Sequence, residues 1–313
     1  MADTAHVLGG VLSRHAREAA IIAMRGTCTY AQWAQDIAST AARLHAAGLR
    51  KGDVLATVMP SSLEAITLLF ACFDRGIIAA PLNGRLPGAA IERALDVSGA
   101  RVCIALREGE LPAYVPDTCR RMTWGELAKT PPATGALPPA FDPGAPATLV
   151  FTSGSTGASK AAALSYRNHA ANAAQSNRNI PVGPGSRWLL SLPLYHVSGL
   201  GVLFRCISGG GAVIVPKEGQ PVHDAVSWYG ATHVSLVATQ FIWMMRSEPG
   251  QQALARVRHI LLGGSAIPAS FLEEAHAKGL PVHKTYGLTE AASQVATTPP
   301  GAPREMLLGA APV

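Results

Sequence analysis

A glycine-rich segment near the middle of the chain carries residue types that suit phosphate binding. An apolar run, residues 148–151, leads directly into TSGSTGASK, residues 152–160. Glycines let backbone N–H groups approach an anion, hydroxyl groups add donors, and Lys160 adds a positive charge. The alternative is a flexible turn, but the preceding apolar run and the following lysine favour phosphate binding. The predicted phosphate-binding residues are Thr152, Ser153, Gly154, Ser155, Thr156, Gly157 and Lys160.

Two other loop motifs do not fit this segment. A Walker A loop has glycine immediately before its lysine, whereas Ser159 occupies that position here. The G-x-S-x-G nucleophile turn also fails, because Ser153 stands in place of its first glycine. The segment therefore predicts a phosphate site of another kind.

Two segments further along the chain contain candidate ligand contacts. The segment PLYHVSG, residues 193–199, places His196 after a predicted strand, although an isolated histidine is usually a packing residue. The segment LLGGSAIP, residues 261–268, has two glycines that permit close backbone approach. A turn that starts a helix explains the second segment equally well.

The segment TYGLTE, residues 285–290, combines three chemical groups. Tyr286 offers a ring face, Thr289 a hydroxyl, and Glu290 a hard oxygen ligand suited to Mg²⁺. Taken alone, the same residues are also typical of a turn and a helix start.

An arginine interrupts the apolar helix predicted over residues 198–209. Ser198 and Arg205 are seven positions apart and therefore share one helix face. An unpaired arginine is costly to bury among apolar neighbours. Arg205 must either reach an acidic residue or receive an anionic ligand, and a planar guanidinium suits a carboxylate.

The elements that position these residues alternate between strands and helices, which indicates an α/β fold with parallel sheets. Helices are predicted at 3–19, 31–47, 61–74 (with Ser61 as N-cap) and 87–98. Strands are predicted at 21–24, 27–30, 54–59, 77–80, 101–106, 148–151, 188–191, 212–215, 233–237, 257–262 and 282–285. The Pro- and Gly-rich residues 131–146 read as a linker or long loop, so we expect two α/β subdomains, 1–146 and 147–313.

Composition excludes several classes of protein. With 313 residues, 48% hydrophobic and 15% charged, the chain is not disordered and can bury a large core. The five cysteines contain no C-x-x-C, and the ten histidines form no ligand-spaced pair, so neither a disulfide framework nor a transition-metal site is expected. Scattered cysteines, the lack of a signal segment and the lack of a membrane span predict a cytoplasmic protein. The net charge of +6 comes without a basic–aromatic stripe, so no nucleic-acid partner is expected.

Taken together and in this order, the four segments resemble the adenylate-forming acyl-CoA synthetase superfamily. The resemblance covers most of the chain, and its specific part is residues 148–290. It implies the large N-terminal domain of such an enzyme, with two αβαβα-type subdomains and a small β-barrel-like region. Where the family usually has proline before the lysine, this chain has Ser159.

The resemblance also implies roles for individual residues. ATP is the first substrate, CoA the second, and Mg²⁺ is held by Glu290. The implied catalytic residues are His196, Lys160, Thr289 and Glu290. The implied adenine-binding residues are Gly263, Gly264, Ser265, Tyr286 and Gly287. The implied acyl-binding residues are His196, Ser198, Arg205, Gly264 and Leu288.

The stretch WLLSLPLYHVSGLGVLFR is similar to one branch of the superfamily, the o-succinylbenzoate–CoA ligases of menaquinone synthesis. That branch activates a dicarboxylate, and the resemblance implies that Arg205, with Ser198, holds the carboxylate that does not react. The alternatives are a ligase for another aromatic or short-chain acid, a non-catalytic nucleotide-binding protein, and a hydrolase of the Ser–Lys amidase type, in which TYGLTE has no role.

The resemblance gives two expectations about the whole protein. The family's ribose-binding Asp motif, hinge and small C-terminal lid domain lie beyond residues 307–313, so the chain is expected to bind nucleotide and acid but to be slow in the overall reaction. A homodimer is expected by family analogy.

Overall fold

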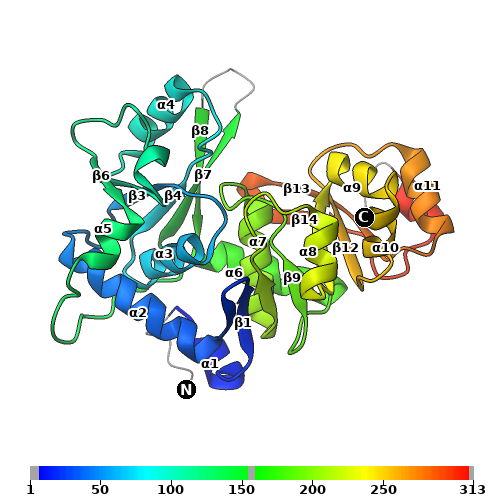
Figure 1. The fold of residues 1–313 in the computed structure, drawn as a ribbon, viewed down its shortest axis with the longest axis horizontal. Helices are drawn as coiled ribbons and strands as arrows, with labels where there is room; N and C mark the ends of the chain where they lie inside the picture. Colours follow the sequence, from blue (N-terminus) through cyan, green and yellow to red (C-terminus); the bar gives the residue numbers. More distant parts are fainter. Residues whose placement is uncertain (1–6, 154–158, 310–313) are drawn as a thin grey trace. The chain divides into compact units, whose positions relative to one another are not determined.

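The computed structural model describes residues 7–153 and 159–309. The strands in these residues form two sheets, and the chain divides into two compact units (Figure 1). Of the described residues, those within 1–16, 30–168 and 194–196 belong to the first unit. Those within 17–29, 169–193 and 197–313 belong to the second unit.

The first unit is built on a six-stranded sheet in the order β6-β5-β3-β4-β7-β8. Its strands are β3 (Val54–Val58), β4 (Ile78–Pro81), β5 (Val102–Ala105), β6 (Arg120–Thr123), β7 (Pro146–Ser153) and β8 (Ser159–Ser165). Its helices are α1 (Gly9–His15), α2 (Tyr30–Ala46), α3 (Leu63–Asp74), α4 (Gly88–Ser98), η1 (Glu108–Glu110) and α5 (Trp124–Lys129). The first five strands of that order run parallel, and β8 turns back antiparallel to β7.

Helices α2 and α3 pack through buried aromatic rings. Trp33 and Phe70 meet edge to face with centroids 4.8 Å apart, and Phe73 meets Phe70 at 5.3 Å. The indole N–H of Trp33 donates to the Thr67 hydroxyl over 3.2 Å. This bond satisfies the buried indole N–H of Trp33 within the apolar layer, which makes burial of the ring favourable.

The second unit is built on an eight-stranded sheet in the order β14-β13-β12-β11-β9-β10-β1-β2. Its strands are β1 (Ala19–Ala23), β2 (Gly26–Thr29), β9 (Arg187–Leu189), β10 (Ala212–Ile214), β11 (His233–Val237), β12 (His259–Gly263), β13 (Val282–Leu288) and β14 (Ser293–Thr297). Its helices are α6 (Tyr166–Asn179, which begins in the first unit), α7 (Val197–Gly209), α8 (Val222–Tyr229), α9 (Ala238–Met245), α10 (Glu248–Leu254), α11 (Ala269–Ala277), η2 (Thr289–Ala291) and α12 (Arg304–Leu308). The six inner strands run parallel, and only the two outer pairs, β1–β2 and β13–β14, are antiparallel.

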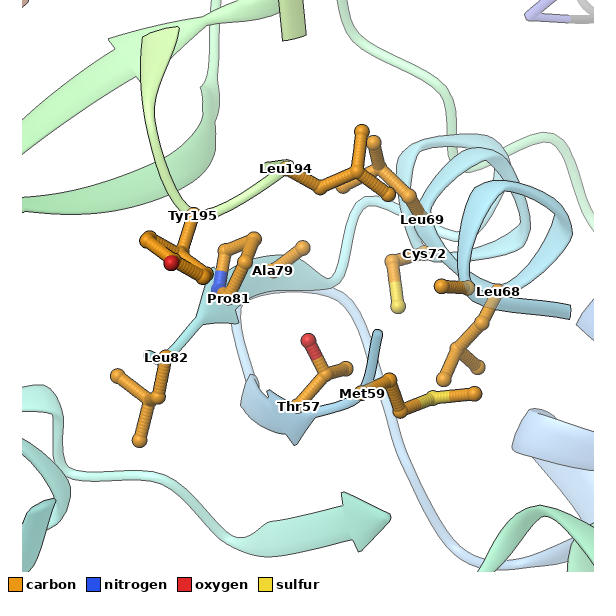
Figure 2. Close-up of a pocket in the computed structure, with 11 residues that line it drawn as sticks. Thr57, Met59, Leu68, Leu69, Cys72, Ala79, Pro81, Leu82, Leu194 and Tyr195 are labelled. Atoms are coloured by element: carbon orange, nitrogen blue, oxygen red, sulfur yellow. The ribbon is translucent and has the colours of Figure 1, made fainter. Parts of the chain in front are cut away.

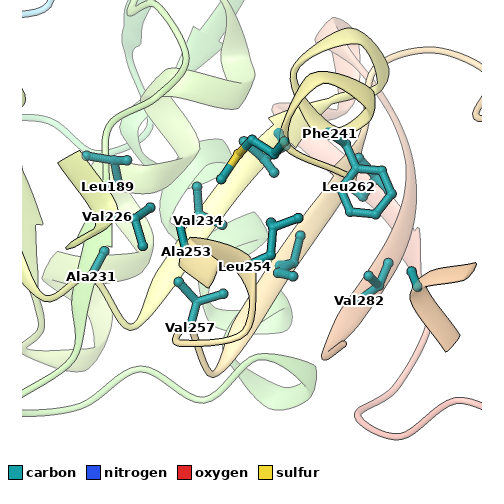
Figure 3. Close-up of a cluster of buried hydrophobic side chains, with 14 of the residues drawn as sticks. Leu189, Val226, Ala231, Val234, Phe241, Ala253, Leu254, Val257, Leu262 and Val282 are labelled. Atoms are coloured by element: carbon teal, nitrogen blue, oxygen red, sulfur yellow. The ribbon is translucent and has the colours of Figure 1, made fainter. Parts of the chain in front are cut away.

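A hydrophobic core fills the space between the central strands and the helices of the second unit. Leu189 of β9, Val234 of β11 and Leu262 of β12 are buried together with Phe241 of α9 and Leu254 of α10 (Figure 3). Strands covered on both faces read as nearly continuous apolar runs, which is why these strands were visible in the sequence.

A row of rings crosses the same sheet. Trp188 of β9, His233 of β11 and His259 of β12 lie directly opposite one another in register. Their ring centroids are 4.9 and 4.7 Å apart, and His283 of β13 continues the row, with its Nε2 2.9 Å from His259 Nδ1. Burial lowers the pKa of both His233 and His259 to about 4, so this row is neutral at pH 7.

The elements agree with the predicted alternation, and the differences are local. Helix α3 starts at Leu63 with Ser62, not the predicted Ser61, as its N-cap, because the Ser62 hydroxyl accepts the Ala65 N–H over 3.1 Å. The antiparallel strand β8 and the β6–α5 pair were not predicted. Every strand in the described residues belongs to one of the two sheets, so these residues contain no separate β-barrel-like region.

The two units also divide the chain differently from the predicted boundary at 146/147. Residues 147–168 stay with the first unit because β7 pairs with β4 and β8 pairs with β7. Residues 17–29 belong to the second unit because β1 pairs in parallel with β10, Ile21 opposite Val213. The predicted loop at 131–146 contains no helix or strand before β7 begins at Pro146.

Three further observations concern the described residues. None of their helices is long and apolar enough to cross a bilayer. They contain no group of three or more His, Cys, Asp or Glu side chains arranged to hold a metal ion. All five cysteines are free thiols.

Replacing the N-cap of α3 tests the observed start of this helix. Ser62→Ala removes the acceptor for the Ala65 N–H and should lower the free energy of unfolding by about 1 kcal/mol. Ser61→Ala is the matched control, and its free energy of unfolding should stay within about 0.5 kcal/mol of that of the unmodified chain. Urea denaturation measures both, and an equal loss in the two variants would contradict the assignment of the cap.

The histidine row predicts how stability depends on pH. Histidines whose pKa falls from 6.5 to about 4 on folding bind fewer protons in the native than in the unfolded state between these values. Stability should therefore be fully present above about pH 7 and fall between pH 6.5 and 4, by about 1 kcal/mol per pH unit for each such histidine. Urea midpoints at pH 7 and pH 5 measure the slope. His233→Gln should flatten it, whereas His276→Gln, at an exposed position, should not.

Candidate functional site

The predicted phosphate-binding segment includes the end of strand β7 and the start of strand β8. Gly154, Ser155, Thr156 and Gly157 lie outside the described residues. On the flanking strands, Thr152 pairs with Lys160 and Ser153 pairs with Ser159. Directly opposed residues of an antiparallel pair project from the same face of the sheet, so the Thr152 hydroxyl and the exposed Lys160 ammonium lie on one face of the β7–β8 pair. Among the described residues, Lys160 has no ion-pair partner, and its charge is available to a ligand.

Tyr195 and His196 follow strand β9 and belong to the first unit. Tyr195 and Leu194 close a small apolar cavity against α3 and β4, lined also by Leu69, Cys72 and Pro81 (Figure 2). The cavity has room for about one water molecule, so it is a packing feature and not a ligand pocket.

The His196 ring contacts the Tyr195 ring edge to face, with centroids 4.7 Å apart. Its side chain reaches the surface, yet part of the ring is removed from water, which lowers the pKa of His196 below its usual value. A neutral imidazole at this position can donate or accept a hydrogen bond but carries no positive charge at pH 7.

Arg205, in the middle of α7, is fully buried. Its Nε donates to the Ser176 hydroxyl of α6 over 2.9 Å, and one terminal nitrogen, Nη2, donates to the Ser293 hydroxyl over 3.3 Å. The guanidinium carbon lies 5.2 Å from the centre of the Trp188 ring. The other terminal nitrogen, Nη1, has no hydrogen-bond partner among the described residues.

The Arg205 side chain folds back along α7 toward Gly201. A Cβ at Gly201 would lie 3.0 Å from Nη2 and 3.1 Å from Nη1, so this position leaves space for the guanidinium. Ser198, half-buried, lies one further turn along the same helix face. The predicted shared face of Ser198 and Arg205 is therefore present in the structure.

The electrostatics of Arg205 are unusual. Among the described residues no carboxylate lies within ion-pair distance of it, and its contacts are two neutral hydroxyls and a ring. Burial lowers the pKa of Arg205 to about 10, which still leaves it charged at pH 7. A buried cation with an unpaired N–H is strongly attractive to an anion, and the two terminal nitrogens suit a carboxylate.

The other predicted ligand-contacting residues lie at the carboxyl ends of the parallel strands β12 and β13. Gly263 ends β12, and Gly264 and Ser265 follow it on the surface. The neighbouring end of β13 carries Tyr286, whose side chain is 56% exposed. Ligands of parallel sheets bind at such carboxyl ends, and an exposed ring there can stack on a flat base.

Strand β13 ends in the short helix η2, which carries Thr289 and Glu290. Leu288, the last residue of the strand, is also exposed. Glu290 is exposed and forms no ion pair with the described residues. A single exposed carboxylate is a donor that suits Mg²⁺, which is commonly bound by one or two carboxylates together with substrate phosphates.

The AMP-binding enzyme family matches residues 11–311 of the chain. The chain belongs to this family. Among curated proteins, it is 34% identical to the 2-succinylbenzoate–CoA ligase of Geobacillus kaustophilus over 279 residues, covering 88% of this chain and 56% of that protein. The ligase of Bacillus pumilus is 29% identical, with 87% of this chain and 56% of that protein covered. The chain thus spans little more than half the length of the curated relatives it matches.

The fold agrees with solved structures of the same family. The o-succinylbenzoate CoA synthetase of Bacillus subtilis, in complex with the acyl-adenylate intermediate OSB-AMP, superposes with a TM-score of 0.82 at 29% identity, covering 94% of this chain and 60% of that one. Its structure with ATP and a magnesium ion gives the same TM-score at 30% identity, covering 94% of this chain and 62% of that one. The expected fold, two α/β units of the large domain of such an enzyme, is confirmed.

In this AMP-binding enzyme the predicted site residues fall into two groups. Thr152, Lys160 and His196 lie in the first unit, and the residues from Ser198 onward lie in the second. The residues around Arg205, namely Ser176, Trp188 and Ser293, were not predicted. They come from α6, β9 and β14. Trp188 begins the stretch that carries the resemblance, whereas no motif or spacing connects Ser176 or Ser293 to α7 in the sequence.

Replacing Arg205 by a residue of similar length tests whether the arginine stabilises the fold. Arg205→Met removes a buried charge that has no carboxylate partner, so the free energy of unfolding should fall by less than about 1 kcal/mol or should rise. Phe204→Ala, at the adjacent buried position, is a positive control that should lose about 3–5 kcal/mol. A loss for Arg205→Met as large as that of the control would show that Arg205 is structural.

Proposed function

We propose that this chain is the nucleotide- and acid-binding part of an AMP-forming acid–CoA ligase that activates o-succinylbenzoate. One observation supports this choice of acid above all others: Arg205 is buried, charged and without a carboxylate partner, and its Nη1 is unpaired. An acid with a second carboxylate supplies the missing partner. The names of the relatives in the family agree with this choice.

In the proposed reaction the acid has two differently placed carboxylates. The ring carboxylate pairs with Arg205, with the Ser198 hydroxyl on the same helix face. The succinyl carboxylate attacks the α-phosphorus of ATP, the bond to pyrophosphate breaks, and an acyl-adenylate forms. The thiol of CoA then attacks the acyl carbon and releases AMP. The chemistry needs mainly positioning and charge stabilisation.

The remaining residues position the nucleotide. In the first unit, Lys160 and the Thr152 hydroxyl contact the phosphates. In the second, Tyr286 stacks on adenine and the Thr289 hydroxyl donates to the α-phosphate. Glu290 would hold Mg²⁺, which neutralises phosphate charge when bound. His196, neutral because its pKa is lowered, orients the reacting acid by a hydrogen bond.

The free cysteines support a reducing compartment, and we propose the cytoplasm as the site of this activity. A ligase for another aromatic acid remains the competing function. It differs from our proposal in one property: a monocarboxylic acid leaves Arg205 unpaired.

The test compares o-succinylbenzoate with 4-oxo-4-phenylbutyrate, which lacks only the ring carboxylate. Pyrophosphate should be released faster with o-succinylbenzoate than with 4-oxo-4-phenylbutyrate. Calorimetry with non-hydrolysable adenylate mimics of both acids measures binding without turnover. Arg205→Ala should weaken binding of the dicarboxylate mimic by about 2–5 kcal/mol, as loss of one partner of a buried charge pair does. Binding of the monocarboxylate mimic should stay unchanged.

Arg246→Ala is the matched control, because Arg246 also lies over an aromatic ring, 5.4 Å from the centre of Phe271, but at the surface. The Arg246→Ala variant should bind both mimics with the affinity of the unmodified chain. If Arg205→Ala keeps full affinity for the dicarboxylate mimic, the ring carboxylate is bound elsewhere. If the unmodified chain does not distinguish the two acids, the proposed substrate is wrong.

A further inference from the structure

A strained turn connects the segment that carries Thr289 and Glu290 to strand β14. Ala292 has φ +59° and Ser293 has φ +143°, and they are the only non-glycine residues in the described part of the chain with positive φ. Such conformations are costly for side chains other than glycine, and they persist only where the surroundings hold them. The contacts of this turn should therefore show what holds it.

The turn contacts both groups of predicted site residues in the second unit, Arg205 and the segment 286–290. The Ser293 hydroxyl accepts a hydrogen bond from Arg205 Nη2 over 3.3 Å. The Ser293 carbonyl packs against Gly287 so closely that a Cβ there would lie 2.0 Å from its oxygen. The Ala292 N–H donates to the Thr289 carbonyl over 2.9 Å. The position of this turn thus determines where Thr289 and Glu290 lie relative to Arg205.

Asn172 of α6 holds the turn on both sides. Its side-chain N–H₂ donates to the Ala291 carbonyl over 3.0 Å and to the Gln294 carbonyl over 2.7 Å. Its side-chain carbonyl accepts from the Gln294 N–H over 3.4 Å. One half-buried amide therefore uses three of its hydrogen-bonding positions on the two residues that flank Ala292 and Ser293.

We propose that Asn172 is a positioning residue: by clamping the strained turn, it fixes the nucleotide-facing segment 286–290 and the anion-binding Arg205 in the relative geometry that acyl-adenylate formation requires. This inference rests on the proposed function. Asn172 touches neither substrate, and its effect is transmitted by Ser293 to Arg205 and by Ala291 to η2.

The same helix offers a matched control. Asn179, also half-buried on α6, donates one side-chain hydrogen bond to the Thr297 carbonyl over 3.2 Å, further along β14 and away from the turn. Asn179→Ala removes a comparable contact between α6 and β14 without releasing Ala292 and Ser293. A loss of general packing would affect both variants alike.

The first measurement is independent of substrates. Amide hydrogen exchange should quicken at residues 289–294 in Asn172→Ala and in the isosteric Asn172→Asp, which cannot donate to the two carbonyls, but not in Asn179→Ala. Ala292→Gly, which adopts positive φ without strain, should restore slow exchange when combined with Asn172→Ala.

The second measurement is calorimetry of this chain with ATP, with and without Mg²⁺, and with the non-hydrolysable adenylate mimic of o-succinylbenzoate. Asn172→Ala should bind the mimic at least tenfold more weakly and lose most of the gain in ATP affinity that Mg²⁺ gives. Asn179→Ala should stay within twofold of the unmodified chain, and Ala292→Gly should recover part of the loss.

The outcomes separate this inference from the function on which it rests. Equal effects of Asn172→Ala and Asn179→Ala, or faster exchange without a change in mimic or Mg²⁺-dependent ATP affinity, would overturn the positioning role. If the unmodified chain binds ATP with Mg²⁺ but shows no preference for the dicarboxylate, the proposed acid is wrong. The exchange and ATP data then still decide whether Asn172 positions the turn.

Discussion

A buried positive charge without a carboxylate partner is the constraint on which the candidate anion site of the second unit depends. Arg205 is surrounded by the hydroxyls of Ser176 and Ser293 and by the face of Trp188, which come from three different elements. Neutral groups of this kind reduce the cost of burying a guanidinium without neutralising it. The guanidinium therefore keeps a strong attraction for an anion. The helix α6 and the strands β9 and β14 supply the neutral groups, so these elements must keep their positions around Arg205.

The parallel sheets explain why the candidate site is built from loops at the ends of strands. In the second unit, the segments after β12 and β13 leave the sheet at the same edge, so residues 263–265 and 286–290 are neighbours although the helix α11 separates them in the chain. In the first unit, the pairing of β7 with β8 places Lys160 opposite Thr152. The predicted site residues that the structure describes thus lie on strands and helices or on the short segments next to them.

Much of this could be predicted from the sequence, and the failures have physical causes. Buried parallel strands such as β10 and β12 consist mainly of apolar residues, so they are visible without tertiary information. Strand β8 was missed because its sequence, SKAAALS, has neither β-branched residues nor strict alternation, and its pairing with β7 decides its conformation. Ser61 and Ser62 are equally good N-caps by type, and only the first turn of α3 selects between them. The burial of Arg205 followed from its apolar neighbours, whereas Ser176 and Ser293 reach it through tertiary packing.

The hairpin β1–β2 has a consequence for how the molecule acquires its structure. Residues 17–29 precede most of the first unit in the chain, yet Ile21 pairs with Val213, so the second unit is discontinuous in sequence. During synthesis the β1–β2 hairpin has no further partner in its sheet until β10 has emerged, and the apolar residues of β1 stay exposed while the rest of the first unit is made. Non-local pairing of this kind slows folding and extends the period in which an unpaired edge can aggregate. A fragment that starts after residue 29 would leave β10 as an open edge, so expression of the second unit by itself requires the hairpin to be grafted back onto it.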